Sequence, residues 1–139
     1  MKILLFGKTG QVGWELQRSL APLGELVALD RTSEGLCGDL TDLDGIAATI
    51  RAVKPNVVVN TAAYTAVDRA EGEPQLCQTI NSLAPEVMGV EADRIGAWMV
   101  HYSTDYVFDG TKTVPYVEED TPNPLGAYGQ TQLAGDLAV

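Results

Sequence analysis

Three glycines spaced three residues apart join an apolar run to a helical pattern near the start of the chain. They are Gly7, Gly10 and Gly13, in the segment GKTGQVG at residues 7–13. Glycine permits a positive φ in a tight turn and, because it lacks Cβ, lets a pyrophosphate approach the backbone at the positive end of a helix. The spacing is GxxGxxG rather than GxGxxG, and taken alone it also fits a tight turn with no ligand.

An acid follows at the place where a dinucleotide site requires one. Asp30 ends the second apolar run, where a carboxylate accepts hydrogen bonds from the adenosine ribose. Because strand, turn, helix, strand and acid occur in order, we predict dinucleotide binding, although Asp30 by itself also fits a solvated turn. Asp30 would repel a ribose 2′-phosphate and favours NAD, whereas Arg31 beside it would offset that phosphate and admit NADP. Asp39, in the next turn, is either an adenine contact or a solvent-exposed acid.

Hydroxyls and a carboxylate gather where the last predicted strand ends. Thr104 and Asp105 lie in the segment HYSTDYVFDG at residues 101–110, and Tyr128 begins the final helical pattern. Ligands of open α/β sheets bind beyond the carboxyl ends of the strands, which is where this segment falls. Taken alone, Tyr128 also fits an ordinary aromatic residue at a helix start. We expect His101, inside the strand, to be a buried structural residue rather than a general acid.

Short apolar runs alternate with helical stripes along the whole chain, and this alternation predicts a doubly wound, parallel α/β sheet. We expect strands at residues 2–6, 26–29, 36–38, 57–59 and 98–102. We expect helices at residues 12–20, 43–53, 74–92 and 127–139, with a loop at 109–124. Thr41 and Asp44 resemble a capping box at the start of the second helix. A sheet that stops in the helix after its fifth strand has one incomplete edge and one incomplete helical layer.

Composition narrows the classes of partner. The 139 residues suffice for one domain with a core. The formal net charge is −10, with no Lys/Arg cluster, which argues against nucleic acid and anionic membrane surfaces as partners. No apolar stretch approaches a membrane span, and we expect a cytoplasmic protein. Cys37 and Cys77 lack the spacing of a metal site or a disulfide framework, so no metal site is indicated.

The chain closely resembles the dTDP-4-dehydrorhamnose reductases, which are extended short-chain dehydrogenase/reductases. The resemblance covers all 139 residues. It rests on the glycine turn, on NTAAYTAVD at 60–68, on STDYVFDG at 103–110 and on YGQTQLAG at 128–135. It implies an NAD(P)-binding Rossmann fold and a hydride passed from NADH or NADPH to the C4 ketone of a nucleotide-linked 4-keto sugar, which completes dTDP-L-rhamnose.

The resemblance also implies roles for individual residues. Tyr128 would protonate the nascent alkoxide, Thr104 would hydrogen-bond the carbonyl oxygen, and Asp105 would contact the sugar. Asn81 matches an asparagine that supports a proton relay in the wider superfamily. The residues implied at the cofactor are Gly7, Gly10, Gln11, Val12 and Gly13 around the pyrophosphate, Asp30 at the ribose, Asp39 and Leu40 beside the adenine, and Ala62, Ala63, Tyr64 and Thr65 along its length.

Two features depart from the family pattern. The family has a lysine one helical turn after its tyrosine, where the ammonium lowers the pKa of the phenol and holds the nicotinamide ribose. This chain has Gln132 there, whose amide can bond the ribose but supplies no charge. Family members are also longer and build much of the sugar pocket from their later portion. We therefore expect residues 1–139 to form the dinucleotide-binding domain without the C-terminal substrate lobe.

Two other functions stay open from the sequence. One is a non-catalytic, dinucleotide-binding regulatory subunit, as in the related β subunit of methionine adenosyltransferase, in which Gln132 would be tolerated. The other is a nucleotide-sugar epimerase or dehydratase, which uses the same tyrosine–lysine pair. The resemblance also leaves room for a homodimer and for Mg²⁺ held by Glu15 at a subunit contact, which one carboxylate does not establish.

Overall fold

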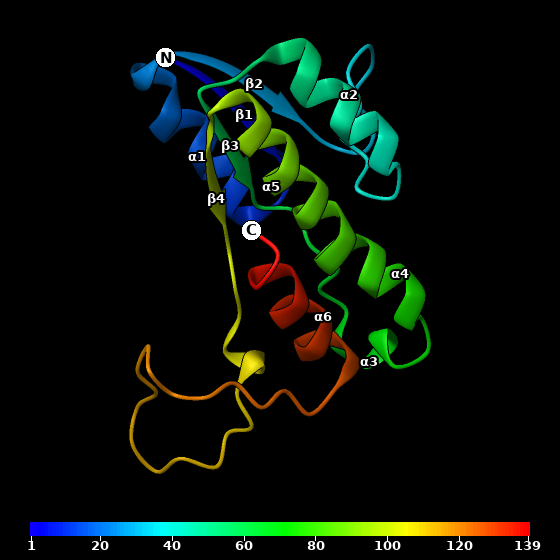
Figure 1. Ribbon diagram of the computed structural model, residues 1–139, viewed down its shortest axis with the longest axis vertical. Coiled ribbons are helices and arrows are strands. Elements are labelled where there is room, and N and C mark those ends of the chain that lie inside the picture. The colour runs from blue at the N-terminus through cyan, green and yellow to red at the C-terminus, as the bar shows by residue number, and fades with distance from the viewer.

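The computed structural model describes residues 1–139 and contains one parallel sheet with helices on both faces (Figure 1). The strands are β1 (Lys2–Phe6), β2 (Glu25–Leu29), β3 (Val57–Asn60) and β4 (Trp98–His101). Their order across the sheet is β2-β1-β3-β4, and every neighbouring pair is parallel. The connections turn in opposite directions on the two sides of β1, which makes its carboxyl end the switch point at which ligands bind in such sheets.

The helices alternate with the strands as predicted. They are α1 (Gln11–Leu20), α2 (Leu43–Val53), α3 (Val67–Ala70), α4 (Pro74–Gln78), α5 (Ala84–Ile95) and α6 (Ala127–Asp136). Short 3₁₀ segments, η1 (Ala21–Leu23) and η3 (Asp105–Val107), follow α1 and β4. The loop at 109–124 extends away from the rest of the molecule in Figure 1. None of the helices is both long and apolar enough to cross a membrane.

Each face of the sheet packs its own helices. Leu4, Phe6 and Val58 point to one face and form the larger core with residues of α2 and α5, among them Ile46 and Met88. The alternate strand residues point to the other face, where α1 packs on them. The smaller core cluster on this face consists of Ile3, Leu5 and Val59, and Leu16 and Leu20 of α1 pack against it. The alternation of strand side chains therefore divides the core into two layers around β1.

The strand predicted at 36–38 is wrong. The backbone of Cys37 is hydrogen-bonded to a side chain of α2 instead of to a strand, because its N–H donates to Thr49 Oγ1 at 2.9 Å and its carbonyl accepts from the same hydroxyl at 3.0 Å. Gly38 nevertheless passes close to β2, since a Cβ there would lie 2.4 Å from the carbonyl oxygen of Asp30. The segment lies beside β2 without forming a ladder.

The predicted capping box is also wrong. The N-cap of α2 is Asp42, whose carboxylate accepts from the N–H of Gly45 at 2.9 Å. Thr41 instead donates through its N–H and its hydroxyl to Asp39 Oδ1, at 2.9 and 2.8 Å. Asp39 therefore closes a local turn immediately before the helix, which competes with the cap that the sequence spacing suggested.

The long helix predicted at 74–92 is interrupted and extends further. A π-helical segment, Thr79–Leu83, separates α4 from α5, and α5 continues to Ile95, where Gly96 ends it in a left-handed conformation. α3 was not predicted from the sequence, and the last helix ends at Asp136, before its predicted end at residue 139. π-Helical segments are frequent at functional sites because they redirect one turn of side chains.

β4 forms one edge of the sheet and is open on the side that carries α1. Trp98 is 79% exposed and Val100 is 41% exposed, although Val100 lies beside the buried Val59 of β3 in the register of the ladder. This agrees with the predicted incomplete edge and helical layer. The candidate site described below lies beyond the carboxyl ends of the strands.

Candidate functional site

The glycine turn leaves no room for side chains at two of its three glycines. Gly7 has φ of +89°, and a Cβ on Gly13 would lie 2.1 Å from the carbonyl oxygen of Gly7. Both positions thus require glycine to pack the start of α1 onto the end of β1. Gly10 differs, because a Cβ there would meet only the carbonyl oxygen of Gly7, at 3.5 Å.

Gly10 is the N-cap of α1, and its carbonyl accepts the first bond of the helix, from Trp14. The N–H groups in the first turn of α1, including those of Gln11 and Val12, have no partner within the helix, as at every helix start. Both residues are exposed. Free N–H groups at the positive end of a ten-residue helix, with no side chain at Gly10, form a site suited to a phosphate.

Asp30 lies across from this turn at the end of β2. Its Oδ1 accepts from the N–H and the hydroxyl of Thr32, both at 2.9 Å, and from the hydroxyl of Ser33 at 3.3 Å. The hydroxyl of Thr32 and the neighbouring Lys8 lower the pKa of Asp30, so the carboxylate is ionised at neutral pH. The turn and β2 are also joined directly, because the N–H groups of Gly7 and Lys8 both donate to the carbonyl of Leu29.

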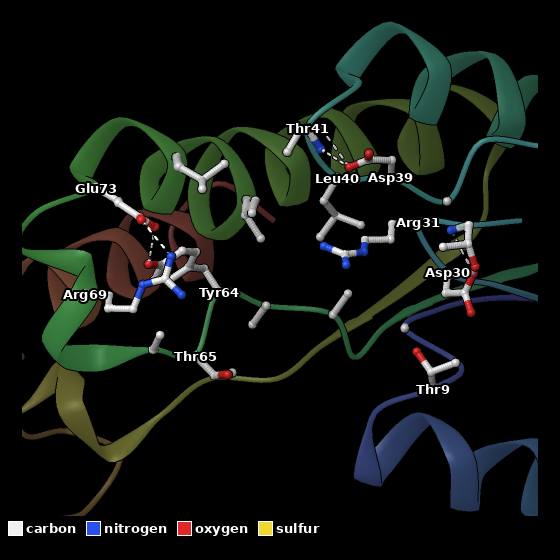
Figure 2. Close-up of a pocket in the computed structure, with 18 residues that line it drawn as sticks. Thr9, Asp30, Arg31, Asp39, Leu40, Thr41, Tyr64, Thr65, Arg69 and Glu73 are labelled. Carbon is white, nitrogen blue, oxygen red and sulfur yellow. Dashed lines mark hydrogen bonds and ion pairs between the residues drawn. The ribbon is translucent and has the colours of Figure 1, made fainter.

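A cavity of about 830 Å³ opens between these elements (Figure 2), within the size range of ligand pockets. It brings together eight of the predicted cofactor residues, which come from four separate segments. They are Gly7, Asp30, Asp39, Leu40, Ala62, Ala63, Tyr64 and Thr65. Gly10, Gln11, Val12 and Gly13 do not line it; Gly13 is buried beneath the turn.

One end of the cavity is closed by a cluster that sequence analysis did not foresee. The hydroxyl of Tyr64 donates to Glu73 Oε2 at 2.6 Å, and Arg69 donates to Glu73 Oε1 at 2.7 Å. The bond to Glu73 raises the pKa of Tyr64, and the same bond, with Arg69, lowers the pKa of Glu73. Figure 2 shows this cluster at one end of the cavity and Thr9 and Asp30 at the other.

The π-helical segment fixes the wall between these ends. Asn81, 1% exposed, accepts from the N–H of Tyr64 at 2.7 Å and donates to its carbonyl at 3.1 Å. Its side-chain amide also lies 3.4 Å from Cys77 Sγ and 3.4 Å from Thr131 Oγ1. Asn81 therefore holds the backbone of Tyr64 against α6, and the relay role that the resemblance implies stays a prediction.

Of the predicted catalytic residues, Tyr128 lies beside a second cavity, of about 510 Å³. Asp105 and Tyr128 line it, together with aromatic and apolar residues of the 105–129 region. The ring of Tyr128 meets the ring of Tyr106 edge-on, with centroids 5.4 Å apart. Thr104 is the N-cap of η3; its hydroxyl donates to Asp105 Oδ1 at 3.3 Å and accepts from the N–H of Tyr106 at 3.3 Å.

Contacts from distant segments place α6, and with it Tyr128. The N–H of Ala127 donates to Glu71 Oε1 at 2.7 Å, so a carboxylate from the turn after α3 caps the start of α6. A Cβ on Gly129 would lie 2.2 Å from the carbonyl oxygen of Tyr106, and one on Gly135 would lie 2.1 Å from that of Asn81. These two glycines let the helix approach η3 and the π-helical segment closely.

Gln132 lies on the inner face of α6 and is 2% exposed. Its Oε1 is buried and has no hydrogen-bond partner in the chain, and it lines neither cavity. One turn later, Asp136 accepts from the hydroxyl of Ser103 and lies 3.6 Å from His101 Nε2. The side chain at the family's lysine position is therefore a neutral amide with an unsatisfied carbonyl.

His101 has a buried side chain, as predicted. Its side chain is 7% exposed, its Nδ1 lies 3.2 Å from Asn60 Nδ2, and its Nε2 is buried without a hydrogen-bond partner. Burial lowers the pKa of His101, and Asp136 opposes that effect. Elsewhere, Glu15 pairs with Arg18 on the surface of α1, and no group of three or more His, Cys, Asp or Glu side chains is arranged to hold a metal ion.

Several cavity residues escaped sequence analysis. They are Thr9, Thr32, Gly38, Thr41, Ala66, Arg69, Glu73, Leu76 and Ile80. Leu76 and Ile80 belong to the helix predicted at 74–92, and Leu76 is 40% exposed. Their place on the wall of the cavity depends on the segments that pack against this helix, which the helical pattern alone does not show.

Comparison with known proteins identifies the family. The profile of the family described as "RmlD substrate binding domain" matches residues 1–139. The chain belongs to this family. A Salmonella typhimurium relative named dTDP-4-dehydrorhamnose reductase is 57% identical over 139 residues, which are 100% of this chain and 46% of the relative. The chain thus spans about half the length of the curated RmlD-family relatives that it matches.

Solved RmlD-family structures share the fold. A dTDP-4-dehydrorhamnose reductase from Clostridium acetobutylicum is 40% identical, with a TM-score of 0.91 over 99% of this chain and 48% of its own. A reductase from Bacillus anthracis, solved in complex with NADP, is 32% identical, with a TM-score of 0.89 over 98% of this chain and 48% of its own. The predicted resemblance and the Rossmann-type fold are confirmed.

Proposed function

We propose that residues 1–139 form the dinucleotide-binding part of an NAD(P)H-dependent reductase that acts on the C4 ketone of dTDP-4-dehydrorhamnose. The observation that carries this proposal is the cavity at the switch point of the sheet, which joins the glycine turn, Asp30, Asp39 and residues 62–65 in one continuous wall. The name and bound NADP of the Bacillus anthracis relative support the cofactor class. The names of the curated relatives favour a reductase over an epimerase or a regulatory subunit.

The residues present fit a dinucleotide. Gly10 leaves open the space that a Cβ would occupy at the helix start, where Gln11 and Val12 offer N–H groups to a pyrophosphate. Asp30 retains one carboxylate oxygen, Oδ2, that accepts no hydrogen bond and is available for a ribose hydroxyl. Leu40, together with Leu76 and Ile80, supplies an apolar wall of the kind that an adenine ring requires.

When bound, the nicotinamide supplies a hydride, and the chain's own residues handle the proton and the developing charge. Tyr128 Oη would give its proton to the substrate's carbonyl oxygen as that oxygen becomes an alkoxide. The hydroxyl of Thr104, on the segment before Tyr106, would donate to the same oxygen. Asp105, on the wall of the second cavity, would accept from a sugar hydroxyl. Gln132 contributes no positive charge to this step.

The first test mixes the chain with NADH, adds dTDP-4-dehydrorhamnose and follows nicotinamide fluorescence and absorbance. We expect a fluorescence change on binding and, with the sugar, oxidation of NADH. A chain that binds neither NADH nor NADPH would refute the cofactor assignment. Binding without oxidation would leave only the dinucleotide assignment standing.

The second test restores the family's charge. Gln132→Lys is expected to raise the rate of NADH oxidation, because the ammonium would assist proton donation from the tyrosine one turn earlier. Gln130→Lys is the matched control, since Gln130 is exposed on the same helix and receives the same charge. An equal change in both variants would be a general electrostatic effect and would count against the assigned role of position 132.

A further inference from the structure

A lysine of the glycine turn faces Asp30 from outside the cavity. Lys8 Nζ lies 3.9 Å from Asp30 Oδ2 and donates a hydrogen bond to Ser33 Oγ at 3.0 Å. Asp30 lines the cavity and Lys8 does not. The ammonium is therefore held beside the Asp30 carboxylate by the turn that follows β2, where it offsets the negative charge of that carboxylate.

The hydrogen bonds of Asp30 divide its two oxygens. Oδ1 receives all three donors, which come from Thr32 and Ser33. Oδ2 receives none and faces Lys8. Oδ2 is thus the atom that a ribose hydroxyl would reach, and it is the atom nearest to the lysine charge. A phosphate on the ribose would interact electrostatically with both Asp30 and Lys8.

A second cation lines the cavity. Arg31 follows Asp30 in the chain, and Figure 2 shows its guanidinium beside Leu40, pointing away from Asp30. It takes part in none of the chain's ion pairs, whereas Arg69, at the other end, is paired with Glu73. Two acids, Asp30 and Asp39, line this end of the cavity, and Lys8 is the cation that lies against Asp30.

We propose that Lys8 is a specificity-determining residue, which compensates Asp30 and so lets this site accept the 2′-phosphate of NADPH as well as the free 2′-hydroxyl of NADH. This inference rests on the proposed dinucleotide function. An uncompensated acid at the end of the second strand repels a 2′-phosphate, and an arginine alone is the usual remedy. Here the compensation would come in addition from the phosphate-binding turn itself, through an ion pair that joins the turn to Asp30.

The test compares dissociation constants for NADH and NADPH, measured by nicotinamide fluorescence, in the unaltered chain and in Lys8→Gln. We expect Lys8→Gln to weaken NADPH binding about 3- to 10-fold more than NADH binding, as for a partly exposed charge several ångströms from a phosphate. The ratio is decisive, because a general loss of packing at the turn would weaken both cofactors equally.

The matched control is Lys2→Gln. Lys2 is also an ion-paired lysine of similar exposure, 3.6 Å from Glu25 Oε1, but it lies at the opposite end of β1. Its substitution should leave the ratio of the two dissociation constants unchanged within about twofold. Lys8→Arg, which keeps the charge, should retain most of the NADPH affinity that Lys8→Gln loses.

A salt titration uses only the unaltered chain, so its result does not depend on whether a variant folds. Raising the ionic strength from about 0.05 to 0.5 M should lower affinity for NADPH more than affinity for NADH. A ratio that stays constant with salt, or that is the same in Lys8→Gln as in the unaltered chain while both cofactors still bind, would overturn this inference alone. Failure of the unaltered chain to bind either cofactor would overturn the proposed function as well.

Discussion

Replacing Gln132 by methionine should make the protein more stable and should weaken its binding of the cofactor. The side chain is 2% exposed, and its Oε1 is buried without a partner. A buried polar group without a hydrogen bond costs about 1–3 kcal/mol, whereas an unbranched apolar side chain of similar size carries no such cost. We expect Gln132→Met to raise the free energy of unfolding by about 1–2 kcal/mol.

Urea denaturation at pH 7, followed by far-UV circular dichroism, measures this difference. A gain of that size corresponds to a rise in Tm of about 3–7 °C, from the unfolding entropy of a domain of this length. Gln130→Met is the control, because Gln130 is exposed on the same helix and its substitution should change the free energy of unfolding by less than about 0.5 kcal/mol. Equal slopes of free energy against urea concentration in all three proteins would show that the native states remain comparable.

The same variants then bind NADH. If the amide serves the nicotinamide ribose, Gln132→Met should weaken NADH binding while Gln130→Met leaves it unchanged. A protein that gains stability as it loses affinity would identify Gln132 as a residue whose polarity serves a ligand. Gln132→Met with unchanged or reduced stability would refute the reasoning, because it would show that the carbonyl has a partner, such as an ordered water, in solution.

Two further predictions concern the frame of the site. Glu91→Gln should lower the free energy of unfolding by about 1–2 kcal/mol at pH 7, because the buried carboxylate accepts two bonds from Arg51 and one from Arg94. Those bonds lower the pKa of Glu91 below its ordinary value of 4.5. The stabilisation is therefore complete above pH 4.5 and is lost as the pH falls through the pKa of the folded state. Urea titrations from pH 7 to 3 should show the difference in unfolding free energy between the unaltered protein and Glu91→Gln shrinking. Gly13→Ala should destabilise by about 1–3 kcal/mol through overpacking, whereas Gly10→Ala should leave stability nearly unchanged and weaken NADH binding; the reverse order in thermal melts and binding titrations would contradict the geometry of the turn.

Local chemistry explains why part of the site was predictable. The positions of Gly7 and Gly13 follow from a turn in which a side chain would collide with the backbone, and the place of Asp30 follows from the end of an apolar run. These requirements act over short stretches, so their residues recur at recognisable spacing. Eight predicted cofactor residues accordingly lie along one cavity.

The errors of prediction arose where two partners compete for the same hydrogen-bonding group. The backbone of Cys37 was expected in a strand, yet it bonds to Thr49 on α2, a partner that tertiary packing brings near. Thr41 has the spacing of a cap, yet Asp39, two residues before it, accepts its hydrogen bonds in a local turn. Spacing along the sequence does not say which of two possible partners a hydrogen-bonding group takes.

By itself, the sequence determined the parallel α/β class, the glycine turn, its acid and the identity of the side chain at position 132, because each depends on residue type and on neighbours along the chain. Only the tertiary structure decided that Lys8 faces Asp30, that Glu73 joins Tyr64 to Arg69 and that Gln132 is buried without a partner. The contact of Lys8 with Asp30 exists because a crossover brings the carboxyl ends of β1 and β2 together. Tyr64, Arg69 and Glu73 meet because the chain turns back on itself around α3. Periodicity along one element cannot specify which side chains then meet.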